Sequence, residues 1–327
     1  MDILSKTRQW VLELQRSRDM KTIVVNAIEA GERIDLFLSR QLNLTRNKII
    51  GLIKSEKIFV NGKLCKASNK VKLGDRIEAD LTPVAETKHK STKVFKSDEI
   101  PFKIIFEDKD IMVIDKPPGL VVHPGNGTKG DTLVDYLRHE GVKRWGIVHR
   151  LDKDTSGVMV IAKNENAQHE LEKQIQNRSV YKEYRALVLG KLSNASVIDA
   201  PIIRHRVIRT KMTTTFLGKG RVAHTEYKVI NTLSINGELV SFVSIIIKTG
   251  RTHQIRVHFN FIGHPVIGDM TYGNKKTQSI AEELGLKRQF LHAHLLRFSH
   301  PITNQLIEFE SFLPEDLQVV LDKLKEV

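Results

Sequence analysis

Apolar residues recur at helical spacing in two short segments near the beginning of the chain. In residues 33–42 the apolar positions are Ile34, Phe37, Leu38 and Leu42, and in residues 45–54 they are Ile49, Ile50 and Ile53. Side chains three and four positions apart share one face of a helix, so both segments are predicted to be amphipathic helices. Thr45 stands where its hydroxyl can cap the second helix.

Alternating and apolar runs separated by turn residues predict strands after this helix pair. A strand over residues 57–60 is followed by Asn61-Gly62, a dipeptide typical of a two-residue hairpin turn, and by a second strand that begins at Lys63. Residues 75–80 predict a third strand. Residues 82–100 are rich in Lys and Thr and lack apolar periodicity, which is typical of a linker.

Strand patterns dominate the rest of the chain. Strands are expected at residues 102–106, 111–114, 119–122, 157–162, 184–189 and 239–247, and helices at residues 132–140 and 164–176. Hairpin-length links outnumber helical crossovers, which predicts an α+β fold with a mixed, mostly antiparallel sheet. The expected organisation is an N-terminal extension (1–21), a small helix-helix-strand domain (22–81), a linker (82–100) and a larger domain (101–327).

The charge of the chain narrows the choice of partners. Its 52 Lys and Arg residues outnumber 38 Asp and Glu, which gives a formal net charge of +14. Residues 173–228 alone hold twelve Lys or Arg against three Asp or Glu. Such a surplus favours polyanionic partners such as nucleic acids. The single cysteine, Cys65, excludes an intramolecular disulfide, and the first twenty residues lack the apolar core of a secretion signal, which together predict a cytoplasmic protein.

Three motifs place charged and ring side chains beside apolar runs. They are DKPPGLVVHP at residues 115–124, HRLDKDTSG at residues 149–157 and KTGRTHQIRVH at residues 248–258. Charged groups beside apolar strands are costly unless they are paired, so the second motif is a candidate site. The third motif follows an apolar strand, and if its residues 252–258 are extended, Arg251 and Arg256 need not share a face.

These motifs, with KEYRALV at residues 182–188, resemble the RluA-type family of ribosomal large-subunit pseudouridine synthases. The resemblance covers nearly the whole chain. The helix pair, the phrase IFVNGK and the later LGDRIE resemble the S4 RNA-binding domain that one subgroup of the family carries at its N-terminus. The resemblance implies isomerisation of uridines in structured RNA, above all large-subunit ribosomal RNA, by base flipping and without a cofactor.

Four residues carry the chemistry that the resemblance implies. Asp152 is its essential carboxylate, and Arg256, with Arg251 as second choice, is the cation that keeps this carboxylate charged in a dry pocket. Tyr184 stacks on the flipped base or removes its C5 proton, and Arg150 fills the space that the base leaves.

A wider set of basic residues is expected to bind RNA. The enzyme itself is expected to act as a monomer without membrane partners. A hairpin in the positively charged stretch would run along phosphates, which position RNA without specifying its sequence. Besides Arg251, the candidates are Arg33, Arg46, Lys48, Lys116, His123, His149, Arg204, Arg206, Arg209 and Lys211.

Three other functions are compatible with parts of the sequence. GNGTKG at residues 125–130 has the glycine spacing of a dinucleotide-binding loop. A non-catalytic RNA-binding factor in ribosome assembly would need only the S4-like module and the basic stretch. The third is a metal hydrolase, because His292, His294 and His300 are close in sequence. No Cys and no clear carboxylate ligand accompany them, so no metal site is expected.

Overall fold

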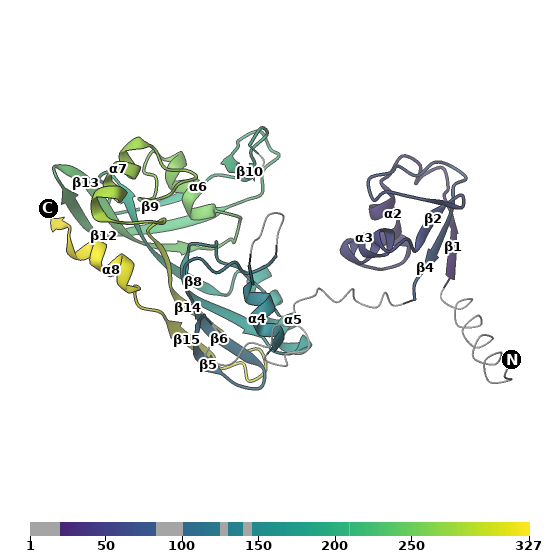
Figure 1. Cartoon of the computed structure of the whole chain (residues 1–327), viewed down its shortest axis with the longest axis horizontal. Coiled ribbons are helices and arrows are strands. Elements are labelled where there is room, and N and C mark those ends of the chain that lie inside the picture. Colours follow the sequence, from purple (N-terminus) through teal and green to yellow (C-terminus); the bar gives the residue numbers. More distant parts are fainter. Residues whose placement is uncertain (1–19, 83–100, 125–129, 140–145, 209) are drawn as a thin grey trace. The chain divides into compact units, whose positions relative to one another are not determined.

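A computed structural model describes residues 20–82, 101–124, 130–139, 146–208 and 210–327 (Figure 1). The chain divides between residues 91 and 92 into two compact units. The smaller unit holds strands β1 to β4 and two helices, and the larger unit holds the other elements.

Two helices and a four-stranded antiparallel sheet make up the smaller unit. The elements are β1 (Met20–Val24), α2 (Ile34–Gln41), α3 (Arg46–Lys54), β2 (Ile58–Val60), β3 (Lys63–Leu64) and β4 (Arg76–Asp80), with the strand order β1-β4-β2-β3. The predicted apolar faces are buried in one core that includes Phe37 and Ile49. The Lys48 amide donates to the Thr45 hydroxyl at 3.4 Å, which confirms the predicted cap.

The turn between β2 and β3 is also as predicted, because Asn61 and Gly62 have φ angles of +50° and +73°. In contrast, β1 has no counterpart among the predicted strands. It pairs with β4 along its whole length, but four of its five residues are exposed. An edge strand with so little burial leaves almost no apolar alternation in the sequence.

A ten-stranded sheet forms the centre of the larger unit. Its strands are β5 (Lys103–Glu107), β6 (Ile111–Lys116), β7 (Ser156–Ala162), β8 (Tyr181–Leu189), β9 (Ala195–Asp199), β12 (His224–Ile235), β13 (Glu238–Ile247), β14 (Leu291–Ser299), β15 (Leu306–Glu310) and β16 (Lys325–Glu326). The main path runs β16-β12-β13-β8-β14-β7-β6-β5, with β15 beside β14 and β9 beside β12. Neighbours are antiparallel except β14 and β7, which confirms the predicted α+β fold with a mostly antiparallel sheet.

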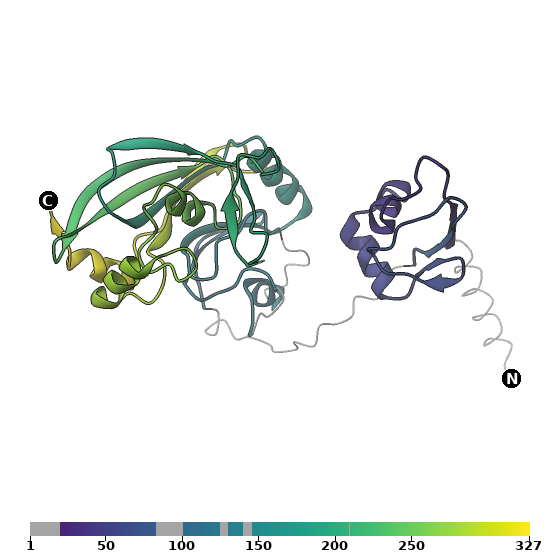
Figure 2. The ribbon, with the colours of Figure 1, turned by 90° about the horizontal axis from the view of Figure 1, so that it is seen from above.

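Helices cover both faces of this sheet (Figures 1 and 2). They are α4 (Leu133–His139), α5 (Glu165–Gln176), α6 (Gln254–Phe261), α7 (Lys275–Leu284) and α8 (Glu315–Asp322). Successive strand residues point to opposite faces. Met159 of β7 accordingly packs in one core with α4 and α6, whereas its neighbour Val160 packs with α5. Within the described residues, every helix is too short or too polar to span a bilayer.

A two-stranded hairpin stands apart from the large sheet. It consists of β10 (Ile202–Arg204) and β11 (Met212–Thr214), which pair antiparallel. Figure 1 shows it projecting from the unit beside α6. The hairpin predicted in the positively charged stretch is therefore present.

Residues 119–122, predicted as a strand, form a loop instead. Pro117 and Pro118 have no N–H for strand pairing, and Gly119 has a φ of +85°, so the chain leaves the sheet after β6. Leu120 and Val122 are still buried in the main core. The apolar alternation of this segment reflects burial of a loop rather than strand pairing.

Gly157 lets the end of the HRLDKDTSG motif approach β14 closely. Its φ is +117°, and a Cβ at this position would lie 2.1 Å from the carbonyl oxygen of Ala293. Gly157 and Ala293 are partners in the parallel pairing of β7 with β14. The glycine therefore anchors one end of the loop that carries Asp152.

Candidate active site

A cavity of about 550 Å³ opens beside the HRLDKDTSG loop. Its lining comes mainly from this loop, the end of α5 with the start of β8, and the segment from the end of β13 into α6. Among the described residues that line it, Asp152 is the only acid, whereas six are Lys or Arg: Arg150, Arg178, Lys182, Lys248, Arg251 and Arg256. The cavity therefore favours an anionic ligand and presents it with a single carboxylate.

Asp152 and Arg256 meet at this cavity although 104 positions separate them in the chain. Arg256 Nη1 donates to Asp152 Oδ2 at 2.9 Å, and the two side chains are 7% and 17% exposed, respectively. At such depth an ion pair is screened much less than at the surface. The structure thus brings the expected carboxylate and its first-choice guanidinium together.

A second carboxylate, Asp269, holds Arg256 from the other side. Arg256 donates from Nε to Asp269 Oδ2 at 2.7 Å and from Nη2 to Oδ1 at 2.8 Å. Asp269 is fully buried and also accepts from the amides of Thr271 and Tyr272. Burial opposes ionisation, but the hydrogen bonds and charge of Arg256 lower the pKa of Asp269. Sequence reasoning missed Asp269, since it stands 13 positions after Arg256 in a turn without a charged motif.

Residues 252–258 would alternate between two faces if they were extended, but most of this segment is helical. Helix α6 begins at Gln254, whose side chain accepts from the Thr249 hydroxyl at 2.7 Å and from the Arg251 amide at 3.0 Å. Its first six residues are all buried. Only Asn260 and Phe261, at its end, are exposed.

The two arginines of this motif have different environments. Arg256 lies on α6 against Asp152, whereas Arg251 lies in the turn before the helix and donates from Nε to the Val222 carbonyl at 2.9 Å. Both side chains line the cavity.

Tyr184 lies on β8 between Ile245 of β13 and Ala293 of β14. Its side chain is 7% exposed and lines the cavity. Burial, followed by the charge of Asp152, raises the pKa of Tyr184 well above its ordinary range. The hydroxyl is therefore protonated at neutral pH in the absence of RNA.

Arg150 and His123 are exposed residues of the cavity lining. Arg150 belongs to the same loop as Asp152. Burial, followed by the charge of Arg150, lowers the pKa of His123. Arg150 is therefore the charged member of this pair at neutral pH.

Lys116 does not have the surface position expected for an RNA contact. It is fully buried, and its Nζ donates to the carbonyl oxygens of Pro117, Leu120 and Lys153 at 2.8, 3.1 and 3.0 Å. Burial lowers the pKa of Lys116 to about 7, but three carbonyl acceptors need the three N–H groups of the ammonium form. Lys116 ties the DKPPGLVVHP loop to the loop of Asp152.

His149 is likewise engaged with the backbone. Its Nε2 accepts from the Val160 amide at 3.1 Å, and burial lowers the pKa of His149 to about 3. The ring is therefore neutral at physiological pH and supplies no charge for a phosphate, although it is among the residues that line the cavity.

Hydrogen bonds link the hairpin to His253, whose ring lies near Asp152. The Met212 amide donates to the Tyr272 hydroxyl at 2.8 Å, and this hydroxyl lies 2.9 Å from His253 Nδ1. The other ring nitrogen of His253, Nε2, lies 3.9 Å from Asp152 Oδ1. Sequence reasoning did not single out His253 or Tyr272.

The other basic candidates lie on the surface of their own units. In the smaller unit, Arg33 and Arg46 pair with the buried Asp35 and remain 43% and 49% exposed, and Lys48 is exposed. In the hairpin region, Arg204 and Arg206 are exposed, and Lys211 lies 6.0 Å above the Tyr272 ring. Arg209 and the GNGTKG residues 125–129 are outside the described residues.

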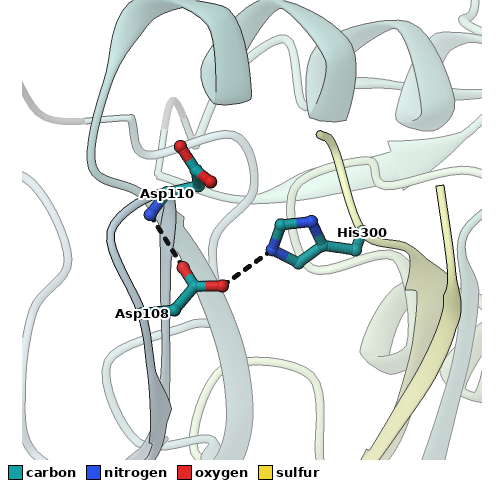
Figure 3. A group of neighbouring side chains, drawn as sticks. All are labelled: Asp108, Asp110 and His300. Atoms are coloured by element: carbon teal, nitrogen blue, oxygen red, sulfur yellow. Dashed lines mark hydrogen bonds and ion pairs between the residues drawn. The ribbon is translucent and has the colours of Figure 1, made fainter. Parts of the chain in front are cut away.

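The three histidines considered for a metal are hydrogen-bonded to protein groups. His292 lies between the Ser156 hydroxyl and the Ser311 carbonyl, which His294 also contacts. His300 groups with Asp108 and Asp110 (Figure 3).

Hydrogen bonds within the protein account for the cluster of Asp108, Asp110 and His300. His300 Nε2 lies 2.8 Å from Asp108 Oδ2, and the other oxygen of this carboxylate accepts hydrogen bonds from two backbone amides. Asp110 Oδ1 accepts from Asn164, and His300 Nδ1 accepts from two amides of the next turn. This arrangement fastens the turn between β5 and β6 to the end of β14 and needs no metal ion.

Comparisons with known proteins agree with this geometry. The RNA pseudouridylate synthase family matches residues 110–261, and the S4 domain family matches residues 32–77. Ribosomal large subunit pseudouridine synthase D of Nitrosomonas europaea is 39% identical over 306 residues, which cover 91% of this chain and 86% of that protein. The protein of the same name in Salmonella typhimurium is 36% identical over 318 residues, which cover 93% and 94%.

Two solved structures share the fold. Human RNA pseudouridylate synthase domain containing 1 has a TM-score of 0.56 and 27% identity, and it covers 69% of this chain and 89% of its own. Human RNA pseudouridylate synthase domain containing 4 has a TM-score of 0.54, also at 27% identity, and covers 68% and 93%. The chain therefore belongs to the RNA pseudouridylate synthase family and carries an S4 domain; it is an RNA pseudouridine synthase.

Proposed function

We propose that this enzyme isomerises specific uridines of large-subunit ribosomal RNA and that Asp152 is its catalytic carboxylate. The observation that carries the assignment is the pairing of Asp152, the only acid among the described cavity residues, with the buried Arg256. The names of the two bacterial relatives support the choice of RNA. Membership of a synthase family favours this function over a non-catalytic assembly factor.

The reaction needs no oxidant, reductant or external energy. The bond from ribose C1′ to uracil N1 breaks, the base turns, a bond from C1′ to C5 forms, and the C5 proton leaves while N1 gains one. Asp152 can attack C1′ or the uracil ring, or promote elimination at the sugar, and each route uses its anionic form. Arg256 holds this anion in place, and Asp269 holds Arg256.

The walls of the cavity suit a nucleotide that has left its stack. Extruding a base costs a few kcal/mol, and stacking on an aromatic ring returns about 1–3 kcal/mol. Tyr184 supplies the ring beside Asp152, and the exposed Arg150 takes the vacated space in the RNA. The S4 unit and the β10–β11 hairpin contribute phosphate contacts through their exposed Lys and Arg residues. The enzyme acts as a cytoplasmic monomer without a cofactor.

Pseudouridine mapping in cells that lack the protein tests both activity and substrate. We expect particular sites in large-subunit ribosomal RNA to lose pseudouridine, and wild-type protein to restore them. The Asp152→Asn variant should not restore them. Restoration by both proteins would support the assembly-factor alternative, and an unchanged large-subunit map would contradict the proposed substrate.

Tyr184→Phe separates the two roles proposed for this residue. The ring remains and the hydroxyl is lost, so a stacking role predicts activity within about fivefold of wild type, because stacking uses the ring face. Removal of the C5 proton by the hydroxyl predicts a loss of about 10²–10⁴-fold in kcat. The measurement is single-turnover pseudouridine formation at saturating enzyme. Tyr184→Leu, which removes the ring as well, should be poorly active in either case.

A further inference from the structure

Arg178 has a backbone conformation that arginine rarely adopts. Its φ is +59°, in the left-handed region. It follows Asn177, the C-cap of α5, and its amide donates to the Ile175 carbonyl, while the Ser179 amide donates to the Gln174 carbonyl. This is the helix-ending position at which glycine is preferred, because a Cβ there is strained.

The residues with a left-handed backbone conformation show where such strain is tolerated. Apart from glycine, the described residues with positive φ are four asparagines, Glu56, Arg178 and His253. Asparagine adopts this conformation readily, because its side chain hydrogen-bonds locally. Of the other three, Arg178 and His253 line the cavity of Asp152. Strained backbone of this kind gathers at functional sites, where the side chain is needed.

Arg178 joins two other arginines at the cavity. Arg178 comes from the end of α5, Arg150 from the loop of Asp152 and Arg251 from the turn before α6. No ion pair joins any of the three to a carboxylate among the described residues. Burial, followed by the charges of Arg221 and Arg178, lowers the pKa of Arg251.

Unpaired guanidinium groups held at one cavity favour a bound anion, because it relieves their mutual repulsion. A guanidinium matches a phosphate in geometry and can donate two parallel hydrogen bonds to it. When a nucleotide is extruded from RNA, the phosphates on either side of it are the anions that must pass the cavity mouth. Arg178 is exposed and lines the cavity, so its side chain can reach such a phosphate.

We propose that Arg178, together with Arg251, clamps a backbone phosphate next to the extruded uridine. The proposal rests on the proposed function, because it takes RNA as the ligand of the cavity. It assigns to Arg178 a positioning role in RNA binding and none in the chemical step. The left-handed conformation is kept because glycine, which would fit the backbone better, has no guanidinium.

Two substitutions separate the side chain from the backbone. Arg178→Ala and Arg178→Gly both remove the guanidinium, but only glycine relieves the strain. On transcribed large-subunit ribosomal RNA we expect both to raise KM about tenfold, as for one lost charged hydrogen-bond contact. We expect kcat to remain within about twofold, and the slope of log affinity against log salt to fall by about 1. The melting temperature of Arg178→Gly should equal or exceed that of wild type and exceed that of Arg178→Ala.

Matched controls test whether charge or backbone alone explains the result. Arg297→Ala removes a half-exposed arginine that does not line the cavity, and Asn304→Gly changes another left-handed position of the same unit. Neither should change KM or the salt slope beyond about twofold. Arg178→Lys keeps the charge but lacks the planar guanidinium, so it should retain part of the affinity that Arg178→Ala loses.

Unchanged KM and salt slope in both Arg178 variants, alongside an active wild type, would overturn the clamp. A Gly variant that melts below wild type would also overturn it, since the side chain would then support the fold. If wild-type protein forms no pseudouridine in this RNA, the proposed function has failed. Filter binding of the same RNA to wild-type and variant proteins then decides the clamp separately, and equal affinities would reject it.

Discussion

Replacing Asp152 with Asn is expected to reduce pseudouridine formation by at least about 10³-fold in a protein that still folds and binds RNA. An amide has the shape of the carboxylate but cannot act as an anionic nucleophile or base. Arg256 keeps both hydrogen bonds to Asp269 in the variant, so the fold loses little. The measurement is the release of tritium from uracil C5 in a labelled ribosomal RNA transcript, since this hydrogen leaves when the new bond forms.

Asp154→Asn is the matched control for this prediction. It removes the same charge from the same loop, but Asp154 is not among the residues that line the cavity. Its loss of rate should therefore stay below about tenfold, with melting temperature and RNA affinity measured for both variants. Residual activity of Asp152→Asn within tenfold of wild type would reject Asp152 as the catalytic carboxylate.

Replacing Arg256 with Met is expected to remove activity and to destabilise the larger unit by about 3–5 kcal/mol. Methionine has a similar length but no charge, so it leaves the fully buried Asp269 without its cation. Breaking a buried ion pair from one side costs about this much, because the remaining charge is uncompensated. Urea denaturation of the full chain, monitored on the larger unit, measures the change.

A double-mutant cycle tells apart the two roles of Arg256. In Arg256→Met with Asp269→Asn, the stranded charge is gone, so a substantial part of the lost stability should return. Activity should not return, because Asp152 still lacks the guanidinium that holds it. Recovery of activity in the double variant would show that Arg256 acts only through the fold.

Much of the fold follows from local patterns. The helix pair, the Thr45 cap and the Asn61-Gly62 turn each depend on residues within a few positions of one another, and all three are present. Local patterns failed where burial does not follow them: β1 was missed because it is an edge strand with four of its five residues exposed. Residues 119–122 are apolar because a loop is buried.

The residues of the candidate site were likewise predicted only in part. The motifs led to Asp152, Tyr184 and Arg256, which all line one cavity. They gave no indication of Asp269, and they placed Lys116 among the RNA contacts although it is fully buried. A motif records which residue types stand near one another in the chain, but the direction of a side chain depends on what packs around it.

The sequence by itself determined the local elements, the class of enzyme and the identity of the charged residues that chemistry on RNA would use. Only the tertiary structure decided that Arg256 lies between Asp152 and Asp269, and that Arg178, at the end of α5, lines the same cavity. The reason is physical. Burial and ion pairing depend on distances through space, and in this protein Asp152 and Arg256, which pair at the cavity, are separated by 104 positions of chain.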